Sequence, residues 1–144
     1  MPAKIVETVD ALVTSLDGGT FTQAFTAEKR QFPLFDVRDV DALTVVCYSL
    51  GRQIEKASRQ YAAASWPKTW QVACNVKKRT DGSNDEVDDL LLLVEQIADH
   101  VADAGKLAGA VVREVTTERL YDARSLDQQA LFDAEIIITL AGFE

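Results

Sequence analysis

The segment from Ser83 to Gly105 constrains the fold most, because it joins a helix start, one apolar face and a helix stop. Ser83 and Glu86 have the spacing of a capping box, in which a serine hydroxyl accepts a hydrogen bond from the amide three residues later. Apolar residues then recur every three or four positions, at Val87, Leu90, Leu91, Val94, Ile97, Ala98 and Val101. Gly105 favours the left-handed conformation that ends many helices. The pattern predicts a helix to about Ala104 that buries one face.

A second amphipathic helix is predicted near the start of the chain, from about Pro2 to Leu16. Its apolar residues fall on one arc: Ile5, Val6, Val9, Leu12, Val13 and Leu16. Proline suits the first helical turn, and Gly18-Gly19 supply the stop. The polar and aromatic stretch from Thr20 to Asp41 alternates weakly, and we expect it to hold a strand followed by an extended arm.

Four further segments have the character of strands. They are 43–48, 69–79, 110–115 and 132–140, and the second and fourth alternate apolar and polar residues along their length. Asp81-Gly82 predicts a turn. The segment 51–64 fits either a helix or an extended hairpin arm. We therefore expect an α+β fold over a single domain, residues 1–144, with one mostly antiparallel sheet of four to five strands and two helices packed on one face.

The composition is that of a folded globular domain, with 47% apolar and 26% charged residues in 144. No apolar run reaches the roughly 18 residues that a membrane span needs, so we expect no membrane partner. The start of the chain lacks the unbroken apolar region of a signal peptide. Two cysteines, Cys47 and Cys74, fit a reducing cytoplasm, and both fall on the apolar phase of predicted strands. We expect them to be buried and unreactive.

The charges are segregated along the sequence. Between Ser49 and Arg79 there are seven bases and one acid, and the bases are Arg52, Lys56, Arg59, Lys68, Lys77, Lys78 and Arg79. Between Thr80 and Ala104 there are eight acids and no lysine or arginine. The two blocks are either solvated faces of opposite sign or complementary surfaces within one chain or between copies. The net charge of −8 argues against general nucleic-acid binding.

The acids of the predicted second helix gather on the face opposite its apolar residues. They are Asp85, Asp88, Asp89, Glu95, Asp99 and Asp103. Acids in the first turn stabilise a helix through its dipole, but Asp99 and Asp103 stand near the C-terminal end, where they oppose it. Leu92 falls in the middle of this acidic arc. It is either an isolated exposed leucine or a residue that contacts a partner.

No catalytic, cofactor or metal site is predicted. His100 is the only histidine, so it cannot build a multi-histidine metal site, and we interpret it as a surface histidine among acids. A calcium loop beginning at Asp81 fails because Glu86 stands where glycine is needed and Leu92 where glutamate is needed. Gly105-Lys106 lacks the other residues of a phosphate loop.

Taken end to end, the elements resemble the tail-terminator (tail-completion) proteins of long-tailed bacteriophages. The resemblance is carried by the order of the segments: an amphipathic helix, the aromatic-basic stretch 21–36, the strand 43–47, Ala57-Ser58-Arg59, the strand 70–79 ending in bases, the acidic leucine-rich helix 85–99, the lead 126–131 and the strand 132–140. It covers nearly the whole chain. It rests on residue types rather than on invariant residues.

The resemblance implies a structural role and no enzymatic activity. Such proteins form a hexameric ring that caps the tail tube, ends its polymerisation and joins it to a head-side connector or neck protein. DNA passes through the lumen of the ring without specific binding, and the protein is assembled in the host cytoplasm and resides in the virion at the head-proximal end of the tail. The basic and acidic blocks would then be candidates for the subunit interface or the lumen.

Three other functions remain open from the sequence. A head-completion or neck protein of the same virion differs in partner rather than in class. A small cytoplasmic protein-binding module would dock its partner on the acidic helix and Leu92. A small enzyme would use Cys47, Cys74 or His100.

Overall fold

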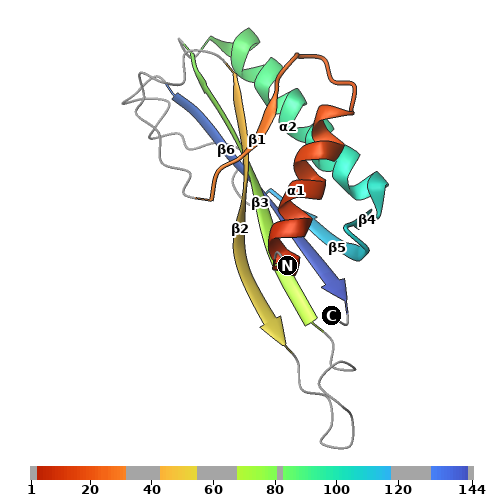
Figure 1. Cartoon of the computed structure of the whole chain (residues 1–144). Helices are drawn as coiled ribbons and strands as arrows, with labels where there is room; N and C mark the ends of the chain where they lie inside the picture. The colour runs from red at the N-terminus through yellow and green to blue at the C-terminus, as the bar shows by residue number, and fades with distance from the viewer. Residues whose placement is uncertain (1–2, 32–42, 55–67, 81–82, 118–130, 143–144) are drawn as a thin grey trace, which may run out of the picture.

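The computed structural model describes residues 3–31, 43–54, 68–80, 83–117 and 131–142 (Figure 1). These residues form two helices, α1 (Lys4–Asp17) and α2 (Asn84–Ala104). They also form six strands: β1 (Ala27–Lys29), β2 (Thr44–Ile54), β3 (Lys68–Arg79), β4 (Lys106–Leu107), β5 (Ala110–Thr116) and β6 (Leu131–Gly142). The α+β class expected from the sequence is therefore confirmed.

The strands form one curled, mixed sheet in the order β1-β2-β3-β6-β5-β4. β1 runs parallel to β2, and every other neighbouring pair is antiparallel. The sheet is mostly antiparallel as expected, but the expected number of four to five strands is not exact, because the described residues form six. β1 is the strand expected within Thr20–Asp41, although it has only three residues. β4 was not expected, because two residues are too few for alternation to reveal a strand in the sequence.

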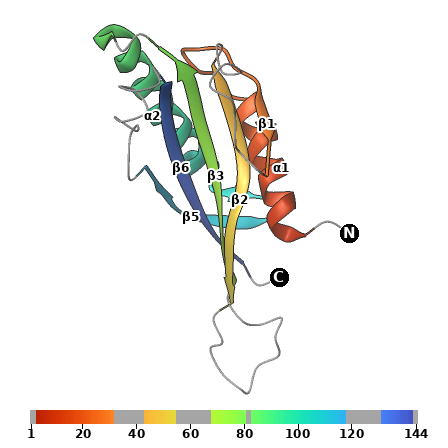
Figure 2. The ribbon, with the colours of Figure 1, turned by 90° about the vertical axis from the view of Figure 1, so that its left-hand side faces the viewer.

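Both helices lie on the same face of the sheet (Figures 1 and 2). α1 contacts β1, β2 and β3, and α2 contacts β5 and β6. The core between the layers is built from alternate strand residues, among them Val45, Cys47, Trp70, Val72, Cys74, Val76, Ile136, Ile138 and Leu140, together with Val9, Leu12 and Leu16 of α1 and Leu90, Leu93, Val94, Ile97 and Val101 of α2. Alternation in the strands thus decides which side chains meet the helices.

Most predicted element boundaries lie within three residues of the observed ones. α2 begins at the expected cap, where the Ser83 Oγ accepts from the Glu86 amide at 3.4 Å, and it ends at Gly105 with φ of 73°. Its buried face differs in detail, because Leu93 is fully buried while Leu91 and Ala98 are half-buried.

The ambiguous segment 51–64 is resolved over its first four residues, which extend β2 to Ile54. Its remainder, the expected arm before Asp41 and the predicted turn at 81–82 lie outside the described residues.

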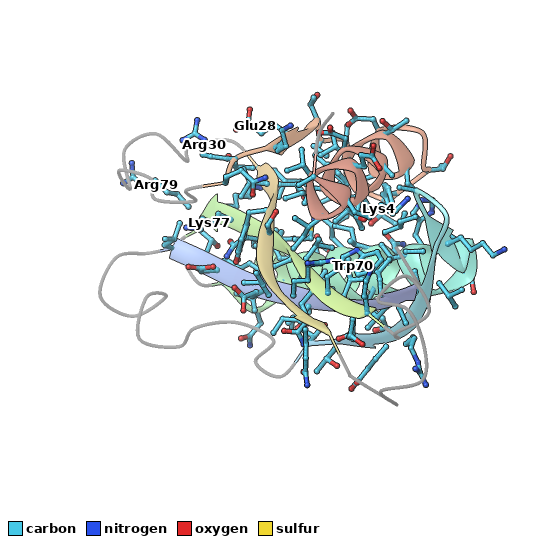
Figure 3. All side chains as sticks on the ribbon, turned by 60° about the horizontal axis from the view of Figure 1, so that its bottom comes forward. Lys4, Glu28, Arg30, Trp70, Lys77 and Arg79 are labelled. Atoms are coloured by element: carbon cyan, nitrogen blue, oxygen red, sulfur yellow. The ribbon has the colours of Figure 1, made fainter. Side chains whose placement is uncertain are left out.

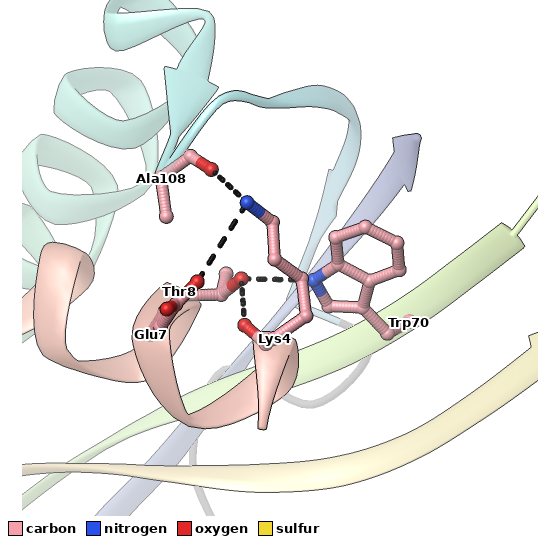
Figure 4. A network of polar contacts seen from close by, with 5 residues as sticks. All are labelled: Lys4, Glu7, Thr8, Trp70 and Ala108. Carbon is pink, nitrogen blue, oxygen red and sulfur yellow. Dashed lines mark hydrogen bonds and ion pairs between the residues drawn. The ribbon is translucent and has the colours of Figure 1, made fainter. Parts of the chain in front are cut away.

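A chain of polar contacts ties the start of α1 to the sheet (Figure 4). The indole Nε1 of buried Trp70 donates to the Thr8 Oγ1 at 2.9 Å, and this hydroxyl donates to the Lys4 carbonyl oxygen at 2.9 Å. The Lys4 Nζ donates to the Ala108 carbonyl oxygen at 2.7 Å, in the turn between β4 and β5. Both Ala108 and Gly109 have positive φ, as a two-residue hairpin turn requires. Trp70 can therefore be buried without an unsatisfied donor.

We predict that Thr8→Val lowers the free energy of unfolding by about 1–3 kcal/mol, because it leaves the Trp70 N–H buried without an acceptor. Urea denaturation measures the change. Thr14→Val is the matched control, since Thr14 bonds the carbonyl oxygen four residues earlier in the same helix but is exposed. A loss no larger for Thr8→Val than for Thr14→Val would contradict the role of the Trp70 contact.

Candidate functional site

The outward face of α2 carries an acidic stripe, which we define as Asp85, Asp88, Asp89, Leu92, Glu95, Asp99 and Asp103. All seven side chains are exposed, and Leu92 has 44% of its surface accessible. The stripe follows the whole helix because the opposite face is buried against the sheet. The structure thus places together all the acidic-helix residues that the sequence singled out.

The acidic stripe has no compensating charge in the part of the chain that the structure describes. None of its six carboxylates forms an ion pair with the described bases, and the last turn of α2 contains no basic residue. Asp99 and Asp103 therefore repel their acidic neighbours and oppose the helix dipole. Local helix stability does not account for these two residues.

The basic residues at the end of β3 are divided between the two faces of the sheet by the alternation of the strand. The Lys77 Nζ lies 3.9 Å from an Asp133 carboxylate oxygen on β6, and the Lys78 Nζ lies 3.6 Å from a Glu86 carboxylate oxygen in the first turn of α2. Figure 3 shows Lys77 and Arg79 at the same end of the sheet as Arg30. These bases are thus used partly to join elements within the chain.

The acidic and basic blocks of the sequence meet inside the chain through the contact between Lys78 and Glu86. Arg52 is exposed near the other end of β2. Lys56 and Arg59 lie outside the described residues. Among the described residues, intrachain ion pairs thus reach the first turn of α2 at Glu86 and do not include the acidic stripe.

His100 faces α1 and is half-buried, so the expectation of a surface histidine is wrong. Its Nε2 lies 3.0 Å from both the Oγ and the carbonyl oxygen of Ser15. The Gly18 amide donates to the Thr14 carbonyl oxygen, and the Gly19 amide donates to the Leu16 carbonyl oxygen. Neither amide bonds the carbonyl oxygen of Ser15, which lies between Thr14 and Leu16 in the sequence. With its proton on Nε2, His100 donates to the Ser15 carbonyl oxygen in the last turn of α1. The sequence offered no sign of the contact, because the two residues are 85 positions apart.

The loop after α1 forms an open pocket of about 280 Å³ that sequence reasoning missed. Leu16, Asp17, Phe21, Gln23 and Phe25 are among its lining residues. The loop is fixed to α2, since the Gln96 Oε1 accepts from the Thr22 amide at 3.1 Å and the Phe21 ring meets the His100 ring edge-on. Gly19 permits this approach, because a Cβ there would stand 2.7 Å from the Phe21 ring.

A small polar cluster lies on the sheet face opposite the helices. The Tyr48 hydroxyl donates to the Glu135 carboxylate across β3. Asn75 beside them is buried, and its Oδ1 has no hydrogen-bond partner among the described residues. Burial, and then the hydrogen bond to Glu135, raise the pKa of the Tyr48 hydroxyl well above its ordinary value. Asn75 acts in the opposite direction.

We predict that Tyr48 stays protonated at pH values where exposed tyrosines ionise, near pH 10. Because its folded-state pKa is raised, the stability it contributes is complete below about pH 10 and is lost as the pH rises through the folded-state pKa. Absorbance titration of tyrosinate in a Tyr61→Phe, Tyr121→Phe background isolates its signal. Glu135→Gln should move the titration to lower pH. Ionisation of Tyr48 near pH 10 in the folded parent would contradict the prediction.

The described segments contain no group of three or more His, Cys, Asp or Glu side chains placed to hold a metal ion. Cys47 and Cys74 are free thiols, and both are fully buried as expected. Neither α1 nor α2 is long and apolar enough to cross a membrane.

Comparison with models of known protein families finds no match, and no curated protein matches the sequence.

Proposed function

We propose that this chain is a structural protein of a phage tail, which caps the tail tube, ends its polymerisation and joins it to a head-side connector as a ring. The proposal combines the resemblance of the sequence to tail terminators with the surface of α2. It assigns the protein no catalytic role. The virion would be its final location.

The observation that carries the proposal is the acidic stripe. Six exposed carboxylates without ion pairs in the described part of the chain surround one exposed leucine, Leu92. Such a surface is stable in water. It would bind most favourably to a partner that places positive charge around an apolar pocket. Because Asp99 and Asp103 do not stabilise their own helix, an interaction outside the chain gives them a role.

A second copy of the chain is the partner that a ring requires. Ring interfaces are heterologous, so two different patches on each subunit meet. The exposed bases Arg52, Lys106 and Arg113 form no ion pair with another described residue, and they are candidates for the complementary patch. The sheet ends in short strands, β1 and β4, which limits association through sheet edges.

The stripe has a second use within the same function. Carboxylates facing the lumen of a ring would keep DNA from adhering as it passes, because like charges repel. Charge reversal of the stripe distinguishes a subunit interface from a lumen surface. Charge reversal at an interface weakens the ring, whereas charge reversal in a lumen leaves the ring intact and creates retention of DNA.

We predict that purified protein forms rings, alone or on contact with tail-tube protein, and that it stops tube growth. Negative-stain microscopy and native mass measurement would detect the rings, and tube length would report termination. A head-completion protein would form complexes with connector protein without limiting tube length. Protein that stays monomeric at high concentration with tube protein present would contradict the proposal.

A narrower prediction concerns the residues of the stripe. If the stripe is the subunit interface, Leu92→Asp and the double variant Asp88→Lys, Asp99→Lys should weaken assembly by about tenfold or more and leave the thermal unfolding midpoint nearly unchanged. Sedimentation at several protein and salt concentrations measures assembly. Leu50→Asp is the control for Leu92→Asp, because Leu50 is also 44% exposed but lies on β2. Glu114→Lys is the control for charge reversal, since Glu114 is an exposed acid on β5. Wild-type assembly by both stripe variants would place the interface elsewhere.

A further inference from the structure

The two cysteines of the chain stand directly opposite one another on neighbouring strands. Cys47 of β2 is the register partner of Cys74 of β3 in the antiparallel pair. Opposite residues in such a pair point to the same face of the sheet, and here that face is the one beneath the helices. The tertiary structure therefore brings together two thiols that are 27 positions apart in the sequence.

The hydrogen bonding of the sheet shows which kind of opposite pair this is. The Arg30 amide donates to the Cys47 carbonyl oxygen at 2.9 Å, so the backbone polar groups of Cys47 point toward β1. Cys47 and Cys74 are consequently a non-hydrogen-bonded pair across β2 and β3. In such pairs the Cα atoms stand about 4.5 Å apart and the side chains are closer than in hydrogen-bonded pairs. A disulfide accommodates Cα separations from about 4.4 Å upward.

The surroundings of the pair shield both thiols from solvent. Both side chains are fully buried in the core between the sheet and the helices. A hydrogen bond with the Cys47 sulfur, followed by burial, raises the pKa of the Cys74 thiol. The folded protein therefore holds Cys74 as a thiol at neutral pH, and alkaline pH favours its reaction.

We propose that Cys47 and Cys74 form a reversible intramolecular disulfide that locks β2 to β3 when the protein meets a peroxide oxidant. One thiolate attacks a peroxide oxygen, the O–O bond breaks and hydroxide leaves, which gives a sulfenic acid. The second thiolate attacks this sulfur, the S–S bond forms, the S–O bond breaks and a second hydroxide leaves. The two thiol protons and the two hydroxides make two waters. The inference does not depend on the proposed function.

The disulfide would constrain the chain segment between the two cysteines. It closes residues 47–74 into a covalent loop, which reduces the freedom of the unfolded chain. We expect the thermal unfolding midpoint of the oxidised protein to rise by about 5–10 °C. Reduction with dithiothreitol should return the midpoint to its original value. In the reducing cytoplasm the pair would remain as thiols, and outside the cell it would oxidise.

The test uses the full chain in two arms. In the first, folded protein is treated with hydrogen peroxide at alkaline pH, and intact mass is measured together with the thiol count under denaturing conditions. The expected product is a monomer about 2 Da lighter with no free thiol. In the second arm, unfolded protein is refolded in a glutathione redox buffer. Both thiols are then accessible to the oxidant before the core forms. The same linked monomer is expected, and peptide mapping should join the fragments that contain Cys47 and Cys74.

The variants Cys47→Ala and Cys74→Ala are matched controls, because each removes one partner from the same buried position. Neither should lose mass or gain thermal stability on oxidation, and circular dichroism checks that each still folds. The proposal is overturned if folded wild-type protein keeps both thiols free after peroxide treatment, or if refolded wild-type protein keeps both thiols free or bound to glutathione. It is also overturned if the main product is a disulfide-linked dimer.

Discussion

The packing of β3 at the centre of the sheet governs the rest of the molecule. Its alternate residues Trp70, Val72, Cys74 and Val76 are all buried beneath the helices, and the strands on either side, β2 and β6, are held to it in register. A shift of one residue would turn this apolar row to the opposite face. The register therefore fixes the donor of Trp70 against Thr8 and the opposition of Cys47 to Cys74.

The same packing determines which side chains are exposed on the surface. Burying one face of α2 leaves the other as a continuous row of carboxylates around Leu92. The alternation that buries Val76 sends Lys77 toward Asp133 on the second face and Lys78 toward Glu86 beside the helix. The bases at the end of β3 thus join elements of the fold, and no described base forms an ion pair with the acidic stripe.

Strong local signals were predictable from the sequence. Ser83 and Gly105 bounded α2, and alternation identified β3 and β6, because each signal lies within one element. The prediction failed where contacts decide structure. β4 is a strand only through its pairing with β5, and Leu93 is buried because the sheet faces an arc of α2 that is turned from Leu91 toward Leu93. His100 was misread for the same reason, since its partner Ser15 lies on the other helix.

The sequence by itself determined the α+β class, the two amphipathic helices and the exposure of the acidic stripe, because helical and strand periodicities assign a face to each residue without knowledge of its neighbours. It also determined that Cys47 and Cys74 are buried. The tertiary structure alone decided the strand order, the parallel direction of β1, the His100 contact and the pairing of the two cysteines. These features depend on which distant segments pair, and that choice is made by the fit of the whole core.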